Sequence, residues 1–385
     1  MAATPDPISL RELNRATLAR QLLLKRRRLG IAAAVEALGA IQSQHPDWPP
    51  AALASRIAAF DPDALRGAYA RRSIVRAGLH RMTQHVVSAA DFWTLWHLTQ
   101  RMRLDQWRLM TRLDPADQRI ARRLEPACAA AVDALRRGPL RRDEFTRVLE
   151  AHAPADLRDL PHRGLSRYFM AVQPLVQVPE RGEVYGRGRY VTAERWIGPS
   201  PEGADDLDAA RSLVVRRHLG AFGPASLSDT LAWIGRRGPI GSWRAALESL
   251  GDELVELRGV DGQALWDLRT APRPDGDTPA PPRFLARWDS ILLAHEPKRR
   301  TRILRREHQS AVFTKNADVL PTILVDGLVA GTWMPAVAGD IARLTVRPFD
   351  RLDARSREAL EAEGRMMLRA IAPAGARHEV AFAAP

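Results

Sequence analysis

The segment of residues 40–50 constrains the fold more than any other short stretch, because three of its last five residues are prolines. These are Pro46, Pro49 and Pro50. Each fixes φ and disfavours a helical conformation in the residue before it, so a preceding helix cannot continue through them. Gln42 and Gln44 lie where a helical pattern ends, one residue apart. We predict a shaped loop that presents both glutamines, since functional residues often lie on such loops; the alternative is that they cap a helix or face solvent.

Helices are predicted on both sides of this loop. Ser9 and Glu12 form a capping-box pattern that opens a first helix, in which leucines recur at helical spacing. Gly30 is expected to end this helix after a run of basic residues. A second short helix is predicted over residues 31–38 and a third over residues 51–60.

A β-hairpin is predicted after these helices. Residues 73–87 are rich in β-branched side chains around a central glycine, and they follow a short helical stretch at residues 63–71. Helices followed by a hairpin are the order of a winged helix, a common DNA-binding unit. His80 and His85 are five residues apart in the hairpin, which would place them on opposite faces, so we expect no metal site there.

Two later segments repeat this order faintly. Gly-Pro turns at residues 138–139 and 223–224 are each followed by polar N-cap residues and an apolar helical run. Strands are then expected over residues 175–178, 184–191, 254–257 and 265–268. We interpret the two segments as a second and a third winged helix.

The remaining segments predict long helices and a β-rich end. Helices are expected over residues 89–113 and 116–137, and three tryptophans of the first are interpreted as core residues. Residues 271–282 are rich in Pro and Asp, which indicates a linker or long loop. An Asp-Gly turn predicts a hairpin over residues 323–333. A strand and a closing amphipathic helix are expected beyond it, over residues 344–348 and 353–371.

The predicted fold is therefore α+β and mostly helical. The first winged helix is expected within residues 8–88 and carries the Gln-x-Gln loop. The other parts are a segment of long helices with the second winged helix, the third winged helix, and the β-rich C-terminal part, over residues 89–200, 205–270 and 283–375.

The charge of the chain indicates a polyanionic partner. The net charge is +13 over 385 residues, and only three of the 58 basic residues are lysines. Arginine binds phosphates bidentately and stacks on bases, so nucleic acid is the predicted partner. The alternative is a coding bias that enriches arginine throughout the chain. The densest basic run after the linker contains Lys298, Arg299, Arg300 and Arg302.

Several classes of protein are excluded. The sequence has no apolar run of 18 residues and no signal-peptide pattern, so we expect a cytoplasmic protein without a membrane partner. The single Cys128 excludes an internal disulfide and a cysteine-rich zinc site. The Walker A, dinucleotide-binding and Gly-x-Ser-x-Gly motifs are absent, and the ten histidines are scattered. We therefore expect no metal and no cofactor.

A basic protein with a rigid glutamine loop fits one kind of chemistry on DNA. Alkylation at N7 makes a purine cationic and hence a good leaving group, so a strong general acid is unnecessary. What remains is to place a water against C1′ of the sugar. A glutamine carbonyl oxygen can accept a hydrogen bond from that water and orient it.

Six further motifs occur in a specific order along the chain. They are Arg76-Ala77-Gly78-Leu79-His80, Phe222-Gly223-Pro224-Ala225, Arg287-Trp288-Asp289-Ser290-Ile291-Leu292-Leu293, Val325-Asp326-Gly327, Gly331-Thr332-Trp333 and Arg347-Pro348-Phe349. With the Gln-x-Gln loop they resemble the AlkZ family of winged-helix DNA glycosylases. The resemblance runs from about residue 13 to residue 371 and so covers nearly the whole chain.

The resemblance implies a fold of three tandem winged helices around a basic concave surface. It also implies an activity, the removal of N7-alkylated purines from DNA. Some members of the family act on interstrand crosslinks or on bulky natural-product adducts. The family's catalytic pair carries over to Gln42 and Gln44. Two positions depart from the family pattern: Ser43 replaces a usually aliphatic residue, and Gly78 replaces a threonine.

The resemblance and the charge together give further candidate residues. Asp47 is either a stabiliser of the sugar cation or a turn residue, and His80 is either a DNA contact or a buried histidine. The expected DNA contacts are Arg76, His80, Arg81, Lys298, Arg299, Arg300 and Arg302. The expected partner is double-stranded DNA with alkylated purines, bound by a monomer.

The function predicted from the sequence is a monofunctional DNA glycosylase that leaves an abasic site, serving DNA repair or antibiotic self-resistance. The first alternative is a non-catalytic winged-helix regulator, which would prefer a DNA sequence over a lesion. An RNA-binding protein is a weaker alternative.

Overall fold

The computed structural model describes residues 7–179, 188–235, 240–316 and 318–384, which divide into two units. The first unit combines Met1–Gly67 with Arg211–Pro385, and the second is Ala68–Ala210. The described residues form an α+β fold that is about half helical and contains three sheets, which confirms the predicted class. The arrangement of three winged helices around a concave surface stays a prediction.

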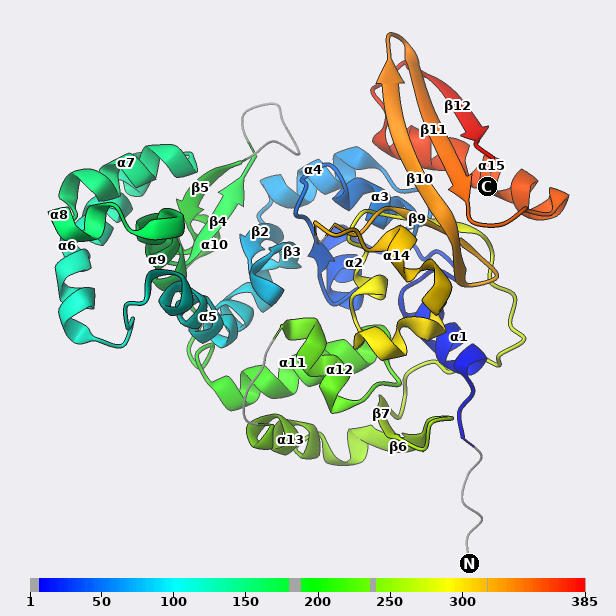
Figure 1. The fold of residues 1–385 in the computed structure, drawn as a ribbon, viewed down its shortest axis with the longest axis horizontal. Coiled ribbons are helices and arrows are strands. Elements are labelled where there is room, and N and C mark those ends of the chain that lie inside the picture. Colours follow the sequence, from blue (N-terminus) through cyan, green and yellow to red (C-terminus); the bar gives the residue numbers. More distant parts are fainter. Residues whose placement is uncertain (1–6, 180–187, 236–239, 317, 385) are drawn as a thin grey trace, which may run out of the picture. The chain divides into compact units, whose positions relative to one another are not determined.

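The first unit combines the described N-terminal segment with the C-terminal part of the chain (Figure 1). Its described helices, two of which cross the unit boundary, are α1 (Leu10–Arg20), α2 (Ile31–Ala37), α3 (Pro49–Ala54), α4 (Pro62–Ala70), α11 (Leu207–Phe222), α12 (Leu227–Ile234), α13 (Gly241–Glu248), α14 (Gln309–Val312) and α15 (Ala354–Ile371). Its described strands are β1 (Ile41–Gln42), β6 (Leu254–Arg258), β7 (Ala264–Leu268), β8 (Arg283–Leu285), β9 (Thr322–Val325), β10 (Leu328–Ala338), β11 (Ile341–Pro348) and β12 (Arg377–Phe382).

Helix α1 begins as predicted but ends early. The Ser9 hydroxyl accepts from the N–H of Glu12, and the Glu12 carboxylate accepts from the N–H of Ser9 at 2.8 Å, completing the capping box. The backbone turns left-handed at Leu22 (φ 58°), so the expected end at Gly30 is wrong. Gly30 is instead the N-cap of α2. Leu22 is buried by tertiary packing, which a helical spacing of leucines does not distinguish from a longer helix.

Two of the three prolines lie in a helix, which corrects their assignment to the loop. Pro49 and Pro50 form the first turn of α3, where a missing N–H costs no hydrogen bond and the fixed φ suits the helix. The helix ends at Ala54, six residues before the predicted end. The loop that carries the glutamines is therefore shorter than the sequence suggested.

The C-terminal sheet has the strand order β12-β11-β10-β9-β8, and β10 and β11 form its long hairpin (Figure 1). As predicted, β9 and β10 are joined through Asp326 and Gly327, whose φ values of 44° and 80° suit a tight hairpin turn. Asn14 and Arg15 of α1 bind this turn: Asn14 donates to the carbonyl of Gly327 at 2.8 Å, and Arg15 donates to the carboxylate of Asp326 at 2.5 Å. The turn therefore fixes the N-terminal helix to the sheet.

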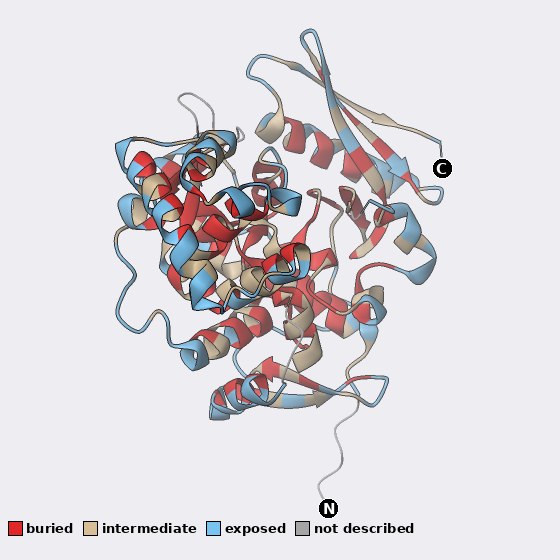
Figure 2. Ribbon diagram, turned by 60° about the vertical axis from the view of Figure 1, so that its left-hand side comes forward, coloured by how far each residue is buried: buried red, intermediate tan, exposed pale blue. Residues whose placement is uncertain are grey.

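Helix α15 covers one face of this sheet. It contacts β8, β11 and β12, and it is buried on one side and exposed on the other (Figure 2). It lies within the predicted range 353–371, with Asp353 as its N-cap. Strand β12, which runs parallel to β11, was not predicted.

The irregular segment at residues 271–282 is confirmed as a long loop, yet it is tied to α1. Arg20 donates to the carbonyl of Pro272 at 3.2 Å, and Arg15 donates to that of Thr278 at 2.6 Å. The loop joins β7 to β8 inside the first unit.

The second unit contains helices around two joined hairpins. Its described helices are α5 (Ala89–Thr111), α6 (Gln118–Arg137), α7 (Arg142–His152), α8 (Ala155–Arg158), α9 (Gly164–Val172) and α10 (Ala193–Ile197). Its strands are β2 (Ile74–Gly78), β3 (Gln84–Ser88), β4 (Leu175–Val178) and β5 (Arg189–Thr192). The pairs β2–β3 and β4–β5 lie close to the predicted positions, although residues 184–187 of one predicted strand lie outside the described residues. Because β2 also pairs with β4, the two hairpins form one sheet.

The tryptophans of α5 are core residues, as predicted. Trp93, Trp96 and Trp107 are each at most 6% exposed. The Trp107 indole N–H donates to the carbonyl of Gly164 at 2.8 Å, so its one polar group is satisfied inside the core of this unit.

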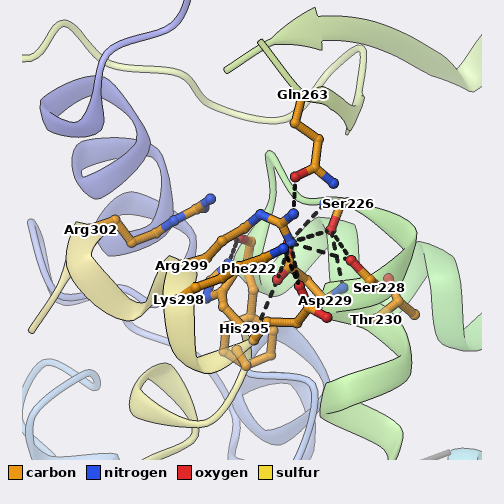
Figure 3. A network of polar contacts seen from close by, with 12 residues as sticks. Phe222, Ser226, Ser228, Asp229, Thr230, Gln263, His295, Lys298, Arg299 and Arg302 are labelled. Carbon is orange, nitrogen blue, oxygen red and sulfur yellow. Dashed lines mark hydrogen bonds and ion pairs between the residues drawn. The ribbon is translucent and has the colours of Figure 1, made fainter. Parts of the chain in front are cut away.

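A buried polar network links α11 and α12 to the segment after Leu293 (Figure 3). His218 donates from Nε2 to the carbonyl of Ala294 at 2.8 Å, and its Nδ1 lies 2.9 Å from the Thr230 hydroxyl. Both contacts suit a neutral ring, with Thr230 donating. Burial, opposed by the Ala294 carbonyl, lowers the pKa of His218 to about 4, and burial together with Arg302 holds the pKa of His295 well below its ordinary value.

These histidines make the stability of the fold depend on pH. Between pH 6.5 and about 4 the unfolded chain binds a proton at His218 that the folded chain excludes, so stability is full above this window and falls as the pH is lowered through it. The loss attributable to His218 should be on the order of 3 kcal/mol. Urea unfolding between pH 7.5 and 4.5 measures it, and His218→Gln should have a shallower pH slope. Equal slopes in both proteins would contradict the assignment.

Candidate functional site

A strained backbone leads into the glutamine loop. Gly39 has a φ of 72°, and a side chain there would meet the Trp233 ring at 3.2 Å. Ala40 has a φ of 119°, a rare conformation for a residue with a Cβ. The Ser290 hydroxyl donates to the carbonyl of Ala40 at 3.2 Å, which fixes the chain just before Gln42.

The two glutamines lie in unequal environments. Gln42 ends β1 and is 5% exposed, Ser43 is fully buried, and Gln44 is exposed. Because the strand ends at Gln42, strand alternation does not extend to Gln44. One amide therefore belongs to the protein interior and the other to the surface, and the catalytic role of the pair stays a prediction.

Aromatic contacts hold the loop on its other side. His45 stacks on Trp288, with ring centroids 5.1 Å apart and an interplanar angle of 17°. Trp48 packs edge-on against Trp333 at 5.4 Å, and the Trp333 indole donates to the carbonyl of Leu285 at 2.8 Å. The residues after Gln44 are thus fixed to the C-terminal half of the chain.

A buried ion pair lies beside the loop. Arg56 donates to both carboxylate oxygens of Asp289 at 2.7 and 2.9 Å, and both side chains are 2% exposed. Both residues line a cavity of about 10 Å³ together with Gln42 and Gln21. That space is close to what one water molecule requires. Asp47 lies outside this cavity and is exposed.

The predicted DNA contacts in the hairpin of the second unit differ in exposure. Arg76 is 9% exposed and donates to the side-chain oxygen of Gln177 on β4, so it helps to join the two hairpins. His80 is fully buried, which agrees with its interpretation as a core histidine. Arg81 is partly exposed in the turn η1 (His80–Met82) and has a φ of 49°. DNA binding by these residues stays a prediction.

The expectation that His80 and His85 lie on opposite faces is wrong. Their ring centroids are 4.8 Å apart, because His80 lies in the turn η1 rather than in a strand. Burial and the charge of Arg81 lower the pKa of His85 to about 3, so this ring is neutral. Within the described parts of the chain, no group of three or more His, Cys, Asp or Glu residues is suited to hold a metal, and no helix is long and apolar enough to cross a bilayer.

The basic run at residues 298–302 is largely part of the interior. Arg299 donates to Asp229 at 3.3 Å (Figure 3) and to Glu296 at 2.9 Å. Arg302 donates to the carbonyl of Pro224 at 2.8 Å. Arg300 lies 4.5 Å from the centre of the Phe313 ring. The Lys298 side chain is 66% exposed. DNA binding by the run stays a prediction, and the two most buried guanidinium groups already have partners in the protein.

The sequence is matched by the family model described as "DNA glycosylase AlkZ-like" over residues 35–370. The chain belongs to this AlkZ-like DNA glycosylase family. A relative described as "Interstrand DNA cross-link repair glycosylase", from Streptomyces sahachiroi, is 29% identical over 196 residues; the match spans 48% of this chain and 50% of that protein. The solved structure of Streptomyces sahachiroi DNA glycosylase AlkZ matches with a TM-score of 0.78 and 22% identity, over 98% of this chain and all of the other.

Residues that support the loop were not identified as site residues from the sequence. Asp289, Ser290 and Trp288 follow one another in a motif noted only for its family resemblance, and Trp333 belongs to another such motif. A buried carboxylate in an apolar stretch is the signal that would have indicated a partner for Asp289.

The buried pair beside the loop gives a stability prediction. Arg56→Met leaves the Asp289 carboxylate buried without its cation, so the free energy of unfolding should fall by about 3–5 kcal/mol. The double variant Arg56→Met/Asp289→Asn removes the uncompensated charge and should be more stable than Arg56→Met alone. Urea unfolding at pH 7.5 measures all three proteins, and a double variant no more stable than the single one would refute the account.

Adjacent residues of the basic run should behave differently. Arg299→Ala removes the cation beside Asp229 and should lower the free energy of unfolding by roughly 3 kcal/mol. Lys298→Ala should change the free energy of unfolding by less than about 0.5 kcal/mol. It should lower the slope of the logarithm of DNA affinity against the logarithm of salt concentration by about one. Unfolding and fluorescence titrations at several salt concentrations test this. Unchanged stability in Arg299→Ala would contradict the structural role.

Proposed function

We propose that this chain is a monofunctional DNA glycosylase that hydrolyses the N-glycosidic bond of N7-alkylguanine-type lesions, including bulky adducts and interstrand crosslinks. The proposal rests on one observation: in a member of the AlkZ-like family, Gln42 and Gln44 lie on a backbone fixed before them by Ser290 and after them by Trp288. DNA repair is the general role, and self-resistance in a toxin producer is its narrower form.

The chemistry follows from what a glutamine can do. An N7-alkylated purine is cationic and leaves without a strong acid, so the enzyme has to position a water against C1′ and tolerate the positive charge that develops on the sugar. The exposed Gln44 is suited to accept a hydrogen bond from that water, and the largely buried Gln42 is suited to hold the loop in place. Because glutamine is a weak base, unmodified purines should not be released.

The carboxylate of Asp47 is the nearest acidic group to the pair along the chain. It is exposed, and we propose that it stabilises the sugar cation as the base departs. No step of this mechanism calls for a cofactor, and the substrate is double-stranded DNA.

Base release from a duplex with one 7-methylguanine tests the proposal. Gln42→Ala/Gln44→Ala should lose at least 100-fold in single-turnover rate, because it removes the group that orients the attacking water and the residue that holds it in place, while DNA affinity is kept. Gln118→Ala, at an exposed glutamine of α6, is the matched control and should retain the full rate. The proposal is wrong if the wild-type protein releases no base from methylated or bulkier lesions. Sequence-preferring binding of undamaged duplex would then favour a regulator.

A further inference from the structure

A pocket of about 360 Å³ lies in the first unit beside the glutamine loop. Its lining comes from the residues after Gln44, the outer half of β10, the end of α15, and single residues of β11 and of the segment before Trp288. We propose that this pocket is a subsite for the flat apolar substituent of a bulky N7-purine adduct. The inference rests on the proposed function and adds to it the part of the lesion that is recognised.

The pocket is continuous with the candidate catalytic loop. His45, which follows Gln44 directly, lines it together with Asp47 and Trp48. Two of these side chains are fixed by ring contacts, His45 on Trp288 and Trp48 on Trp333. A group held in the pocket is therefore next to the residues that would act on the glycosidic bond, against a wall that is already ordered.

The wall contributed by β10 is apolar and open to solvent. Met334 and Val337 both line the pocket and are 44% and 55% exposed, so two large hydrophobic side chains of this strand lack a full covering in the protein alone. Leu368 and Ile371 of α15 line it from another side. A flexible methionine beside an indole adapts well to flat ring systems of different outline.

The two charged side chains that line the pocket do not prevent an apolar group from binding in it. The Arg287 guanidinium is paired with Asp318 at 2.9 Å and lies 5.4 Å from the centre of the Trp288 ring. Asp47 is exposed, and its negative charge suits the cationic base that carries the substituent. Occupation of the pocket thus requires no desolvation of an unpaired arginine.

The size of the pocket distinguishes the substituent from the methyl group of a simple lesion. Pockets that bury drug-sized ligands begin at about 300 Å³, which is far more than one methyl group fills. A polycyclic aromatic substituent matches this volume and the apolar lining. The proposal assigns the pocket to this substituent rather than to the purine, which every N7-alkylated lesion shares.

The experiment introduces a large side chain at an exposed position that lines the pocket. Ala336 lines the pocket on β10, whereas Ala338, exposed on the same strand, does not. The ratio of kcat/KM for duplex 7-(anthracenylmethyl)guanine to that for duplex 7-methylguanine should fall at least tenfold in Ala336→Trp and stay within twofold in Ala338→Trp. About tenfold is the lower end of what contacts in an apolar pocket contribute to the ratio of kcat/KM between two substrates.

A second readout is independent of catalysis. Free 7-(anthracenylmethyl)guanine should bind to the wild-type protein and to Ala338→Trp, and at least tenfold more weakly to Ala336→Trp, by fluorescence. Circular dichroism and the melting temperature check that each variant is folded. If Ala336→Trp does not fold, Val337→Asp is used in its place.

The outcomes separate the two proposals. Equal losses on both lesions would assign the pocket to the purine or to DNA in general and overturn the inference, as would an unchanged ratio in both variants. Failure of the wild-type protein to release either base would overturn the proposed function instead, and the inference with it.

Discussion

Buried pairs of arginine and carboxylate hold the first unit together. The unit is made from two stretches that are more than 140 residues apart, and Arg20 joins them by donating to both carboxylate oxygens of Asp267 at 2.6 and 2.8 Å, with both side chains at most 1% exposed. Arg56 joins them again through Asp289. A buried pair of this kind specifies position more than it adds stability, because either partner alone would be a costly uncompensated charge.

The same pairs change how the basic composition is understood. The sequence suggested that arginine serves a polyanionic partner, yet Arg20, Arg56, Arg299 and Arg302 are buried and donate to partners inside the protein. A guanidinium is suited to this use because its planar donors fit a carboxylate or several carbonyl groups at once. The positive charge available to a polyanionic partner therefore comes from fewer arginines than the composition implies.

The position of the glutamine loop depends on this framework. Asp289 is held by Arg56, and the residues on either side of it, Trp288 and Ser290, contact His45 and the carbonyl of Ala40. The ion pair and the loop thus share one short segment of chain. In the proposed hydrolysis a weakly basic amide has to be held in position in advance, and this arrangement fixes the backbone on either side of the two glutamines.

The sequence by itself determined the local elements and the family. The capping box at Ser9, the Asp-Gly hairpin turn at residue 326 and the core tryptophans of α5 were predictable, because each depends on neighbours in the chain or on hydrophobicity. The tertiary structure alone decided where the first helix ends, that His80 meets His85, and which arginines are buried. These features depend on contacts between residues far apart in the sequence or on turn geometry, and no spacing rule encodes either of them.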